Sequence, residues 1–397
     1  MPEFATLRFP GIAGPVVLTP DPALLQGLAA CLSGWVPQIT RSRRPPADVL
    51  AAVAATGDGL YHLRSRFIDR PTGNLPLASA ICALLADLSQ GWAEAQPDVI
   101  GLHGGAVQIG GTLLLVTGPA RAGKSTLLTR LALAPGVQLF SDDVLPVTPA
   151  NEGVALGIAP RLRLPAPASA PALRRLAETA MILSDDRYGY VTVPDQAPHG
   201  TIAPIGAVLL LDRQPGTAAQ LYRLDPAEAL STLLRQSITG FVSAEAAFAR
   251  AQALTAGRPC LRLTYSDLEE ATALILQNLA PGMALPADLP TAPRLPNEGD
   301  PLPDPVAADC VFIRDPMARL RHHGAAAYLW HPDDTMLWEL NPIGHAIWQM
   351  LELPGSARDL AEALAWNFPD IPVPRLEDDS ARLLARLAAA GLVRARH

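Results

Sequence analysis

Residues 102–126 have the sequence LHGGAVQIGGTLLLVTGPARAGKST, and this stretch decides the fold. Two apolar runs, 106–109 and 112–117, flank a pair of glycines, which predicts a β-hairpin with a two-residue turn. The second run is apolar at nearly every position, as expected for a strand buried on both faces. A glycine-rich loop follows, and residues 124–134 then predict a helix. A buried strand, a glycine-rich loop and a helix in this order indicate an α/β fold.

The glycine-rich loop matches the pattern G-x-x-x-x-G-K-[ST] at Gly118, Gly123, Lys124 and Ser125. Glycines let the backbone turn tightly, so that successive N–H groups point at phosphate oxygens, and the start of the following helix adds its positive dipole end. The ammonium of Lys124 is expected to reach the β- and γ-phosphates of ATP, and the hydroxyl of Ser125 to ligate Mg²⁺. The predicted nucleotide-binding residues are Gly118, Pro119, Ala120, Arg121, Ala122, Gly123, Lys124, Ser125 and Thr126. A glycine loop without a ligand is the alternative, which the flanking strand and helix disfavour.

Lys124 is the only lysine of the chain. The sequence contains 31 lysine and arginine residues, of which 30 are arginine. Under such a bias, a position that accepts arginine tends to become arginine. We infer that position 124 requires a compact ammonium, which a planar guanidinium does not replace.

An aspartate pair, Asp142-Asp143, follows the short apolar run 137–141, which predicts a strand. One carboxylate there could hold Mg²⁺, assigned to Asp142 together with Ser125, and the other could accept the proton of an attacking hydroxyl. The alternative is a surface turn or helix cap. A hydrophobic strand that brings the pair to the same sheet edge as the loop favours the catalytic role. His103, taken alone, is more typical of a structural histidine.

Together, LHGGAVQIGGTLLLVTGPARAGKST (102–126) and LFSDD (139–143) resemble the HPr kinase/phosphorylase family. The resemblance covers residues 60–280 and is strong over 102–145. It implies a P-loop kinase core related to phosphoenolpyruvate carboxykinase, with ATP and Mg²⁺ bound by Lys124 and Ser125. It further implies that Asp142 and Asp143 divide the base and metal roles, with His103 beside them as a catalytic residue.

The sequence departs from that family at two places. Pro119-Ala120-Arg121 replaces the small residues of the usual loop, and no downstream glycine-rich segment with a metal-binding glutamate is found. Residues 160–165, PRLRLP, are closer to the divergent HPr-kinase-related proteins of peptide-modification gene clusters. In this segment, Arg161 or Arg163 is expected either to contact phosphate or to have a surface or packing role. The sequence gives less support to a functional role for Arg187 and Tyr188.

Four domains or segments are predicted along the chain. Residues 1–100 form a mixed α/β region packed on the core, with a helix over 78–92, and residues 101–280 form the ATP-binding domain. A proline-rich linker covers 281–308, since prolines among small and polar residues indicate an extended tether. Residues 309–397 form a separate C-terminal domain.

In the C-terminal domain, the sequence pattern predicts short strands at 310–313, 326–330 and 335–340, followed by three helices. Its residues 340–348, LNPIGHAIW, resemble the PqqD family of small winged-helix-like modules. The resemblance implies that residues 309–397 bind the leader of a ribosomally made precursor peptide. A winged-helix DNA binder is the alternative, but no helix here is basic. We expect that His322, His323 and His331 lie in loops and bind no metal, because they have neither cysteines beside them nor an ordered ligand spacing.

The bulk composition limits the partners. A net charge of −7 argues against nucleic acid, and no apolar stretch reaches the roughly 18–20 residues of a membrane span. Four cysteines without a CxxC pair fit a reducing compartment, and Met1-Pro2-Glu3-Phe4 begins no recognisable secretory signal. We expect a cytoplasmic protein without membrane contact. The resemblance also allows a homo-oligomer.

These features predict an ATP-dependent kinase that phosphorylates a serine or threonine hydroxyl of a precursor peptide captured by the C-terminal domain. An ATP-gated peptide chaperone without phosphoryl transfer is the first alternative. An HPr-type protein serine kinase and a small-molecule kinase are the others.

Overall fold

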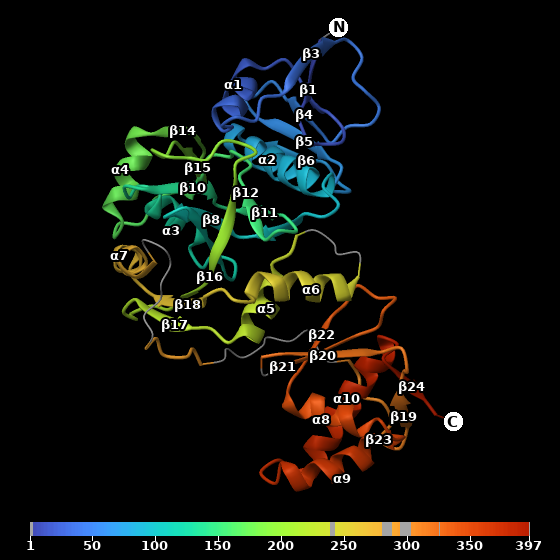
Figure 1. The fold of residues 1–397 in the computed structure, drawn as a ribbon. Coiled ribbons are helices and arrows are strands. Elements are labelled where there is room, and N and C mark those ends of the chain that lie inside the picture. The colour runs from blue at the N-terminus through green and yellow to red at the C-terminus, as the bar shows by residue number, and fades with distance from the viewer. Residues whose placement is uncertain (1–2, 239–242, 280–287, 294–302, 325, 397) are drawn as a thin grey trace. The chain divides into compact units, whose positions relative to one another are not determined.

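The structure is a computed structural model that describes residues 3–238, 243–279, 288–293, 303–324 and 326–396 (Figure 1). Its contacts divide the chain into two units. Unit 1 comprises residues 1–224, 235–239 and 257–292, and unit 2 comprises 225–234, 240–256 and 293–397. Two segments of the predicted 101–280 domain therefore belong, by their contacts, with the C-terminal part of the chain. The bounds of the four predicted segments stay predictions.

The N-terminal part of unit 1 is a six-stranded sheet with two helices. The sheet runs in the order β3 (Gln38–Ser42), β1 (Phe4–Arg8), β2 (Val16–Leu18), β4 (Ala51–Ala55), β5 (Tyr61–Ser65) and β6 (Thr72–Leu75). Helix α1 (Pro22–Ala30) begins at Asp21, whose side chain accepts hydrogen bonds from the first turn. Helix α2 (Leu77–Glu94) confirms the helix predicted over 78–92 and buries Ile81, Leu84 and Leu88 in the shared core.

The central sheet of unit 1 contains the hairpin and the glycine-rich loop. Its strands run in the order β10 (Val137–Ser141), β8 (Gly105–Ile109), β9 (Thr112–Thr117), β16 (Ile202–Arg213), β12 (Glu152–Val154), β11 (Val144–Val147) and β7 (Ile100–His103), with β18 (Cys260–Tyr265) beside β16 and β17 (Gln220–Arg223) beside β18. Strands β9, β16 and β18 are parallel. Helix α3 (Lys124–Leu131) is shorter than the predicted helix over 124–134, and helix α7 (Leu268–Leu279) follows β18. Both helices contribute to one buried cluster with β9 and β18.

Strands β9 and β10 end at the same edge of this sheet. Both are antiparallel to β8, which lies between them: Ser141 pairs with Ala106, and Val116 pairs with Gly105. The loop that follows β9 and the aspartates that follow β10 therefore meet at one edge, as predicted.

A small sheet completes the surroundings of that edge. It runs in the order β13 (Arg161–Arg163), β15 (Tyr188–Val191) and β14 (Met181–Ser184), and α4 (Pro171–Thr179) lies between β13 and β14 in sequence. The segment PRLRLP thus contains a strand, with Arg161 opposite Tyr190 and Arg163 opposite Tyr188.

Unit 2 contains two three-stranded sheets and five helices among its described residues. The sheets are β23 (Gly355–Ser356), β19 (Val311–Arg314), β24 (Val393–Ala395) and β20 (Arg319–His323), β21 (Ala326–Trp330), β22 (Trp338–Leu340). The helices are α5 (Pro226–Arg235, all but its last residue), α6 (Ala244–Thr255), α8 (Pro342–Met350), α9 (Ala357–Asn367) and α10 (Val373–Ala389). The placement of His322 and His323 in a loop was wrong, because both lie in β20.

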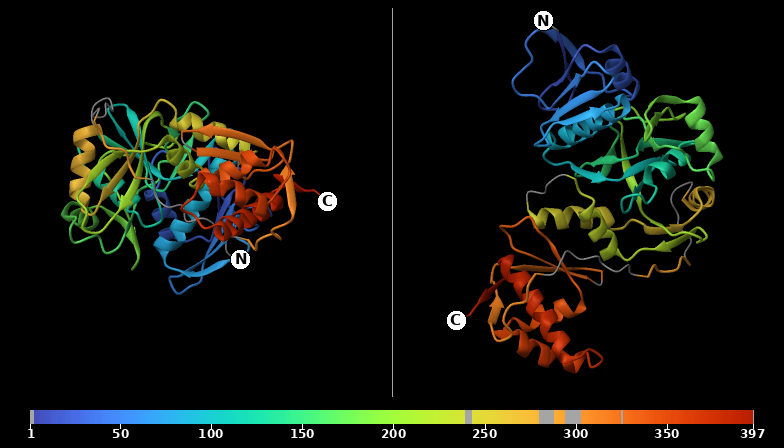
Figure 2. Two further views of the ribbon diagram at one scale, coloured as in Figure 1. Left: turned by 90° about the horizontal axis from the view of Figure 1, so that it is seen from below. Right: turned by 180° about the vertical axis from the view of Figure 1, so that it is seen from behind.

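Strand β21 is buried along its whole length, and its side chains alternate between two clusters. Ala327 and Leu329 pack with α8, α9 and α10. Tyr328 and Trp330 on the opposite face pack with α5 and α6, including Phe248. The sheet is therefore covered on both faces, and two of the covering helices, drawn in yellow in Figure 2, come from residues 225–256.

The predicted linker 281–308 is described in part, because 281–287 and 294–302 lie outside the described residues. Thr291 forms a parallel bridge with Arg223 at the end of β17, and Ala292 is buried. In unit 2, the N–H of Val306 donates to the carbonyl of Ala381 on α10. Within the described part of the chain, no helix combines the length and the hydropathy that crossing a bilayer requires.

Candidate active site

The loop at residues 118–125 connects β9 to α3 and adopts backbone angles that favour glycine. Gly118 has φ +150° and Gly123 has φ +94°, and a Cβ on Gly123 would lie 2.6 Å from the hydroxyl oxygen of Tyr265. That hydroxyl donates a 2.7 Å hydrogen bond to the carbonyl of Ala122. The end of β18 thus fixes the loop from behind.

Lys124 is buried within this loop, with an exposed fraction of 8%. Its Nζ donates to the carbonyl oxygens of Gly118 at 2.9 Å and Pro119 at 3.2 Å. Burial lowers the pKa of Lys124, and the negative charge of Asp143 acts in the opposite direction. The N-terminus of α3 has no side-chain cap. An ammonium and the first turn of an uncapped helix therefore meet at the loop, an arrangement that suits an anion.

Asp142 is almost fully buried, with an exposed fraction of 5%. Its Oδ2 accepts a 2.9 Å hydrogen bond from the backbone N–H of Arg161, and its carbonyl accepts one of 3.2 Å from Oγ of Ser125. Burial, and then the charge of Asp143, raise the pKa of Asp142 to about 7, although Arg161 and Ser125 act against this. Asp142 thus connects the start of α3 to β13.

Asp143 has a different environment, with a side chain that is 47% exposed. Oδ1 lies 3.4 Å from Nε2 of His103, and Oδ2 lies 3.7 Å from Nη2 of Arg161. The contact with His103 lowers the pKa of Asp143, and the positive charges of Arg161 and Lys124 lower it further. Asp143 therefore stays ionised at neutral pH.

Steric crowding explains why positions 104 and 105 are both glycine. A Cβ on Gly105 would lie 2.4 Å from the carbonyl oxygen of Ser141 and 2.8 Å from Cα of Asp142. A Cβ on Gly104 would lie 2.8 Å from the carbonyl oxygen of Val116. Only glycine lets β8 approach the ends of β9 and β10 so closely.

A cavity of about 470 Å³ opens beside the loop. This volume lies within the range of roughly 300–1,000 Å³ typical of ligand sites. Five cationic side chains, Lys124, Arg121, Arg161, Arg163 and Arg213, line it together with one carboxylate, Asp143. An excess of positive charge around a helix start fits a polyphosphate.

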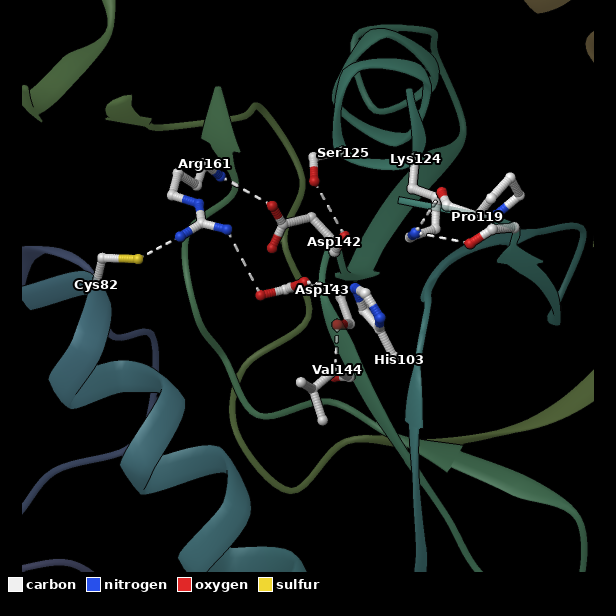
Figure 3. A network of polar contacts seen from close by, with 11 residues as sticks. Cys82, His103, Pro119, Lys124, Ser125, Asp142, Asp143, Val144 and Arg161 are labelled. Atoms are coloured by element: carbon white, nitrogen blue, oxygen red, sulfur yellow. Dashed lines mark hydrogen bonds and ion pairs between the residues drawn. The ribbon is translucent and has the colours of Figure 1, made fainter. Parts of the chain in front are cut away.

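The cavity brings together most of the predicted site residues but not all of them. His103, Ala120, Arg121, Gly123, Lys124, Ser125, Thr126 and Asp143 line it. Gly118, Pro119, Ala122 and Asp142 do not. Asp142 instead lines a second cavity of about 60 Å³ with Cys82, Arg161 and Tyr190. Figure 3 shows Arg161 between the two aspartates and Cys82, whose Sγ is in contact with Nη1 of the arginine.

Three lining or supporting residues were missed or given little weight from the sequence. Arg213 ends β16, which is parallel to β9, so its place at the edge of the loop could have been inferred from the strand order. Tyr265 ends β18 in the same way. Tyr188 had no such signal, since it reaches the cavity through the small sheet.

Among the described residues, no group of three or more histidines, cysteines, aspartates or glutamates could hold a metal ion. A Mg²⁺ ion that accompanies a nucleotide needs only one or two protein ligands, because phosphate oxygens and water complete its octahedron. Ser125 and Asp143, which both line the large cavity, fit that requirement.

Comparison with known families assigns the C-terminal part of the chain. Residues 327–393 match the family described as coenzyme PQQ synthesis protein D (PqqD). The match runs from β21 through α8, α9 and α10 to the start of β24. It confirms the PqqD-like part of the prediction. No curated protein matches the chain.

Proposed function

We propose that this chain is an ATP-dependent kinase that phosphorylates a serine or threonine hydroxyl of a ribosomally synthesised precursor peptide captured by residues 309–397. The observation that carries the proposal is the large cavity, which places the chain's only lysine, Lys124, on the same surface as Asp143 and His103. A phosphate-binding loop and an ionised carboxylate are two of the parts that phosphoryl transfer to a hydroxyl uses, and Mg²⁺ is another.

ATP is the phosphoryl donor in this proposal. Lys124 would exchange its hydrogen bonds to the loop carbonyls for bonds to phosphate oxygens. The negative charge of the phosphate would also offset the cost of burying the Lys124 ammonium. Arg121 and Arg213 supply further positive charge on the loop side of the cavity. Ser125 would hold Mg²⁺ together with phosphate oxygens and water, and the ion would neutralise charge on the β- and γ-phosphates.

The acceptor hydroxyl would lie against Asp143. The oxygen of that hydroxyl would form a bond to the γ-phosphorus while the bond between the γ-phosphorus and the β,γ-bridging oxygen breaks. ADP would leave, and the hydroxyl proton would pass to a carboxylate oxygen of Asp143. The lowered pKa makes Asp143 a weak base, which suffices because little proton transfer is needed in a loose transition state. His103, 3.4 Å from Oδ1, would hold the carboxylate in position.

The peptide part of the proposal is supported by the match to PqqD at residues 327–393. Capture of a leader by that domain would raise the local concentration of the acceptor at the cavity. Asp142, assigned earlier to Mg²⁺, would instead support the site, because its carboxylate is bonded to the backbone of Arg161 and does not line the large cavity.

The test is incubation of the full-length protein with ATP labelled on the γ-phosphate and a precursor peptide encoded beside its gene. We expect label on a serine or threonine, and none with Lys124→Ala or Asp143→Asn. Arg174→Ala, an exposed substitution on α4, is the matched control and should leave labelling unchanged. Peptide affinity that changes with ATP, without a covalent product, would select the chaperone alternative instead.

A further inference from the structure

We infer that Arg163 determines acceptor specificity by binding a carboxylate next to the acceptor hydroxyl, so that the substrate is an acidic peptide segment. The inference rests on the proposed kinase function and adds a substrate class to it. It concerns the acceptor-side wall of the cavity, defined as Arg161, Arg163 and Tyr188.

Arg161, the first residue of this wall, lies beyond the aspartates as seen from the loop. In Figure 3, Lys124 and Arg161 stand on opposite sides of Asp142 and Asp143. Attacking and leaving oxygens are roughly in line across the transferred phosphoryl group. If Lys124 marks the side of the nucleotide, the acceptor enters from the side of Arg161.

Strand pairing fixes the geometry of this wall. Arg163 is paired with Tyr188 across β13 and β15. The guanidinium carbon of Arg161 lies 4.8 Å from the centroid of the Tyr188 ring, and that of Arg187 lies 5.5 Å from it. The ring thus holds two guanidinium groups by cation–π contact, and three arginines gather at one place.

The charges of these arginines are not equally balanced. Arg161 faces Asp143 at 3.7 Å, and Arg187 is close enough to Asp185 to lower the pKa of that carboxyl. Arg163 forms no ion pair with any residue that the structure describes, and its side chain is exposed on the cavity. On the loop side, Lys124, Arg121 and Arg213 already supply charge for the nucleotide. Arg163 therefore carries the positive charge on this wall that can bind a group of the acceptor.

A carboxylate is the peptide group that this position fits. A guanidinium offers paired N–H donors that match the two oxygens of a carboxylate, and the partly enclosed cavity strengthens such a bond. In a peptide, that carboxylate is either an aspartate or glutamate side chain or the C-terminus. Both sources share the chemistry, and the two can be distinguished by amidation of the terminus.

The experiment compares acceptor peptides that carry the same leader. One has aspartate beside the acceptor serine, one has asparagine there, and each is made with a free and an amidated C-terminus. Binding to the full-length protein is measured in the presence of a non-hydrolysable ATP analogue, and kcat/KM is measured with ATP. The wild type should favour the peptide with the carboxylate by about tenfold or more in both measurements. Arg163→Gln should remove that preference, Arg163→Glu should reverse it so that the asparagine peptide is favoured, and Arg174→Gln should change nothing.

Each outcome decides the inference separately from the kinase function. A preference in binding that Arg163→Gln abolishes, without any phosphorylation, would support the contact between Arg163 and a peptide carboxylate and reject the kinase. Phosphorylation with equal kcat/KM for the aspartate and asparagine peptides would overturn the inference and keep the kinase. A raised KM for ATP in Arg163→Gln, with the peptide preference intact, would assign the arginine to the nucleotide and also overturn it. Equal binding of all peptides with no phosphorylation would reject both.

Discussion

Oδ2 of Asp142 accepts a 2.9 Å hydrogen bond from the backbone N–H of Arg161, which ties the end of β10 to the first residue of β13. The adjacent Asp143 faces the cavity instead, where its Oδ1 lies 3.4 Å from Nε2 of His103. Two neighbouring carboxyls thus have pKa values that shift in opposite directions: burial raises that of Asp142, and the hydrogen bond with His103, followed by positive neighbours, lowers that of Asp143. In such a pair, Asp142 can stabilise the structure of the site while Asp143 takes part in the chemistry.

The first prediction concerns the stability of Asp142→Asn. An amide oxygen can still accept the N–H of Arg161, whereas the buried charge disappears. Because the native state holds the proton of Asp142 more tightly than the unfolded chain, the free energy of unfolding of the wild type should fall as pH rises from about 4 to about 7, then level off. Asp142→Asn should lack the part of this decline that Asp142 contributes, while Asp87, whose pKa burial raises to about 6, keeps its own part in both proteins. The variant should exceed the wild type at pH 8 by on the order of 2 kcal/mol.

Urea denaturation at pH 5, 6, 7 and 8 checks this prediction. Asp48→Asn, at an exposed position, is the control and should follow the wild type at every pH. A variant that is less stable than the wild type at pH 8 would show that the charged carboxylate, rather than the neutral one, is favoured in the fold.

The second prediction uses the single lysine. Lys124→Arg should lower phosphoryl transfer by at least about a hundredfold, nearly as much as Lys124→Ala. The reason is the fit of Nζ between two loop carbonyls at 2.9 and 3.2 Å, where a planar, longer side chain cannot place its charge. Steady-state rates and ATP affinity provide the measurement, and Arg174→Lys serves as the control. If Lys124→Arg kept a tenth of the activity or more, arginine bias alone would explain the missing lysines.

Much of this architecture could be predicted from the sequence. The hairpin and the strand at 137–141 were correct because glycine pairs and uninterrupted apolar runs depend on local chemistry. The meeting of the loop and the aspartates at one edge was also correct, since it follows from strand direction.

Other features depend on contacts that no local pattern contains. Asp142 and Asp143 are the same residue type, and only the position of β13 decides which carboxyl is buried. The sequence AAYLW at 326–330 indicates burial on both faces, but α5 and α6, which cover one of them, precede it by about 70–100 residues. Periodicity does not reveal such a partner.

The third prediction tests the close approach at Gly105. A Cβ there would lie 2.4 Å from the carbonyl oxygen of Ser141 and equally close to Cδ1 of Leu128, and backbone cannot shift as a side chain can. Gly105→Ala should therefore lower the free energy of unfolding by about 1–3 kcal/mol and displace Asp142 and Asp143 enough to lower activity at least tenfold. Gly355→Ala, whose Cβ would meet nothing closer than 3.8 Å, is the matched control. Equal stability of the two variants would contradict the prediction.

The fourth prediction concerns the covering of the β21 sheet. The hydroxyl of Tyr328 donates a 2.8 Å hydrogen bond to the carbonyl of Ala227 on α5 and lies 2.7 Å from Oγ of Ser231, which in turn donates to Glu339 at 2.6 Å. Tyr328→Phe leaves that buried carbonyl without this donor, so the free energy of unfolding should fall by about 1–3 kcal/mol. Denaturation followed by tryptophan fluorescence is a suitable measurement, because Trp330 is buried in the same cluster.

A double-mutant cycle with Ser231→Ala separates the hydrogen bonds from general packing. The two substitutions should be non-additive by about 0.5 kcal/mol or more, since both remove parts of one network. Tyr222→Phe, whose hydroxyl donates to the exposed Gln220, is the control and should change stability by less than about 0.5 kcal/mol. Additive effects of Tyr328→Phe and Ser231→Ala would mean that α5 is held on the sheet by apolar contacts alone, with no role for the buried hydroxyl network.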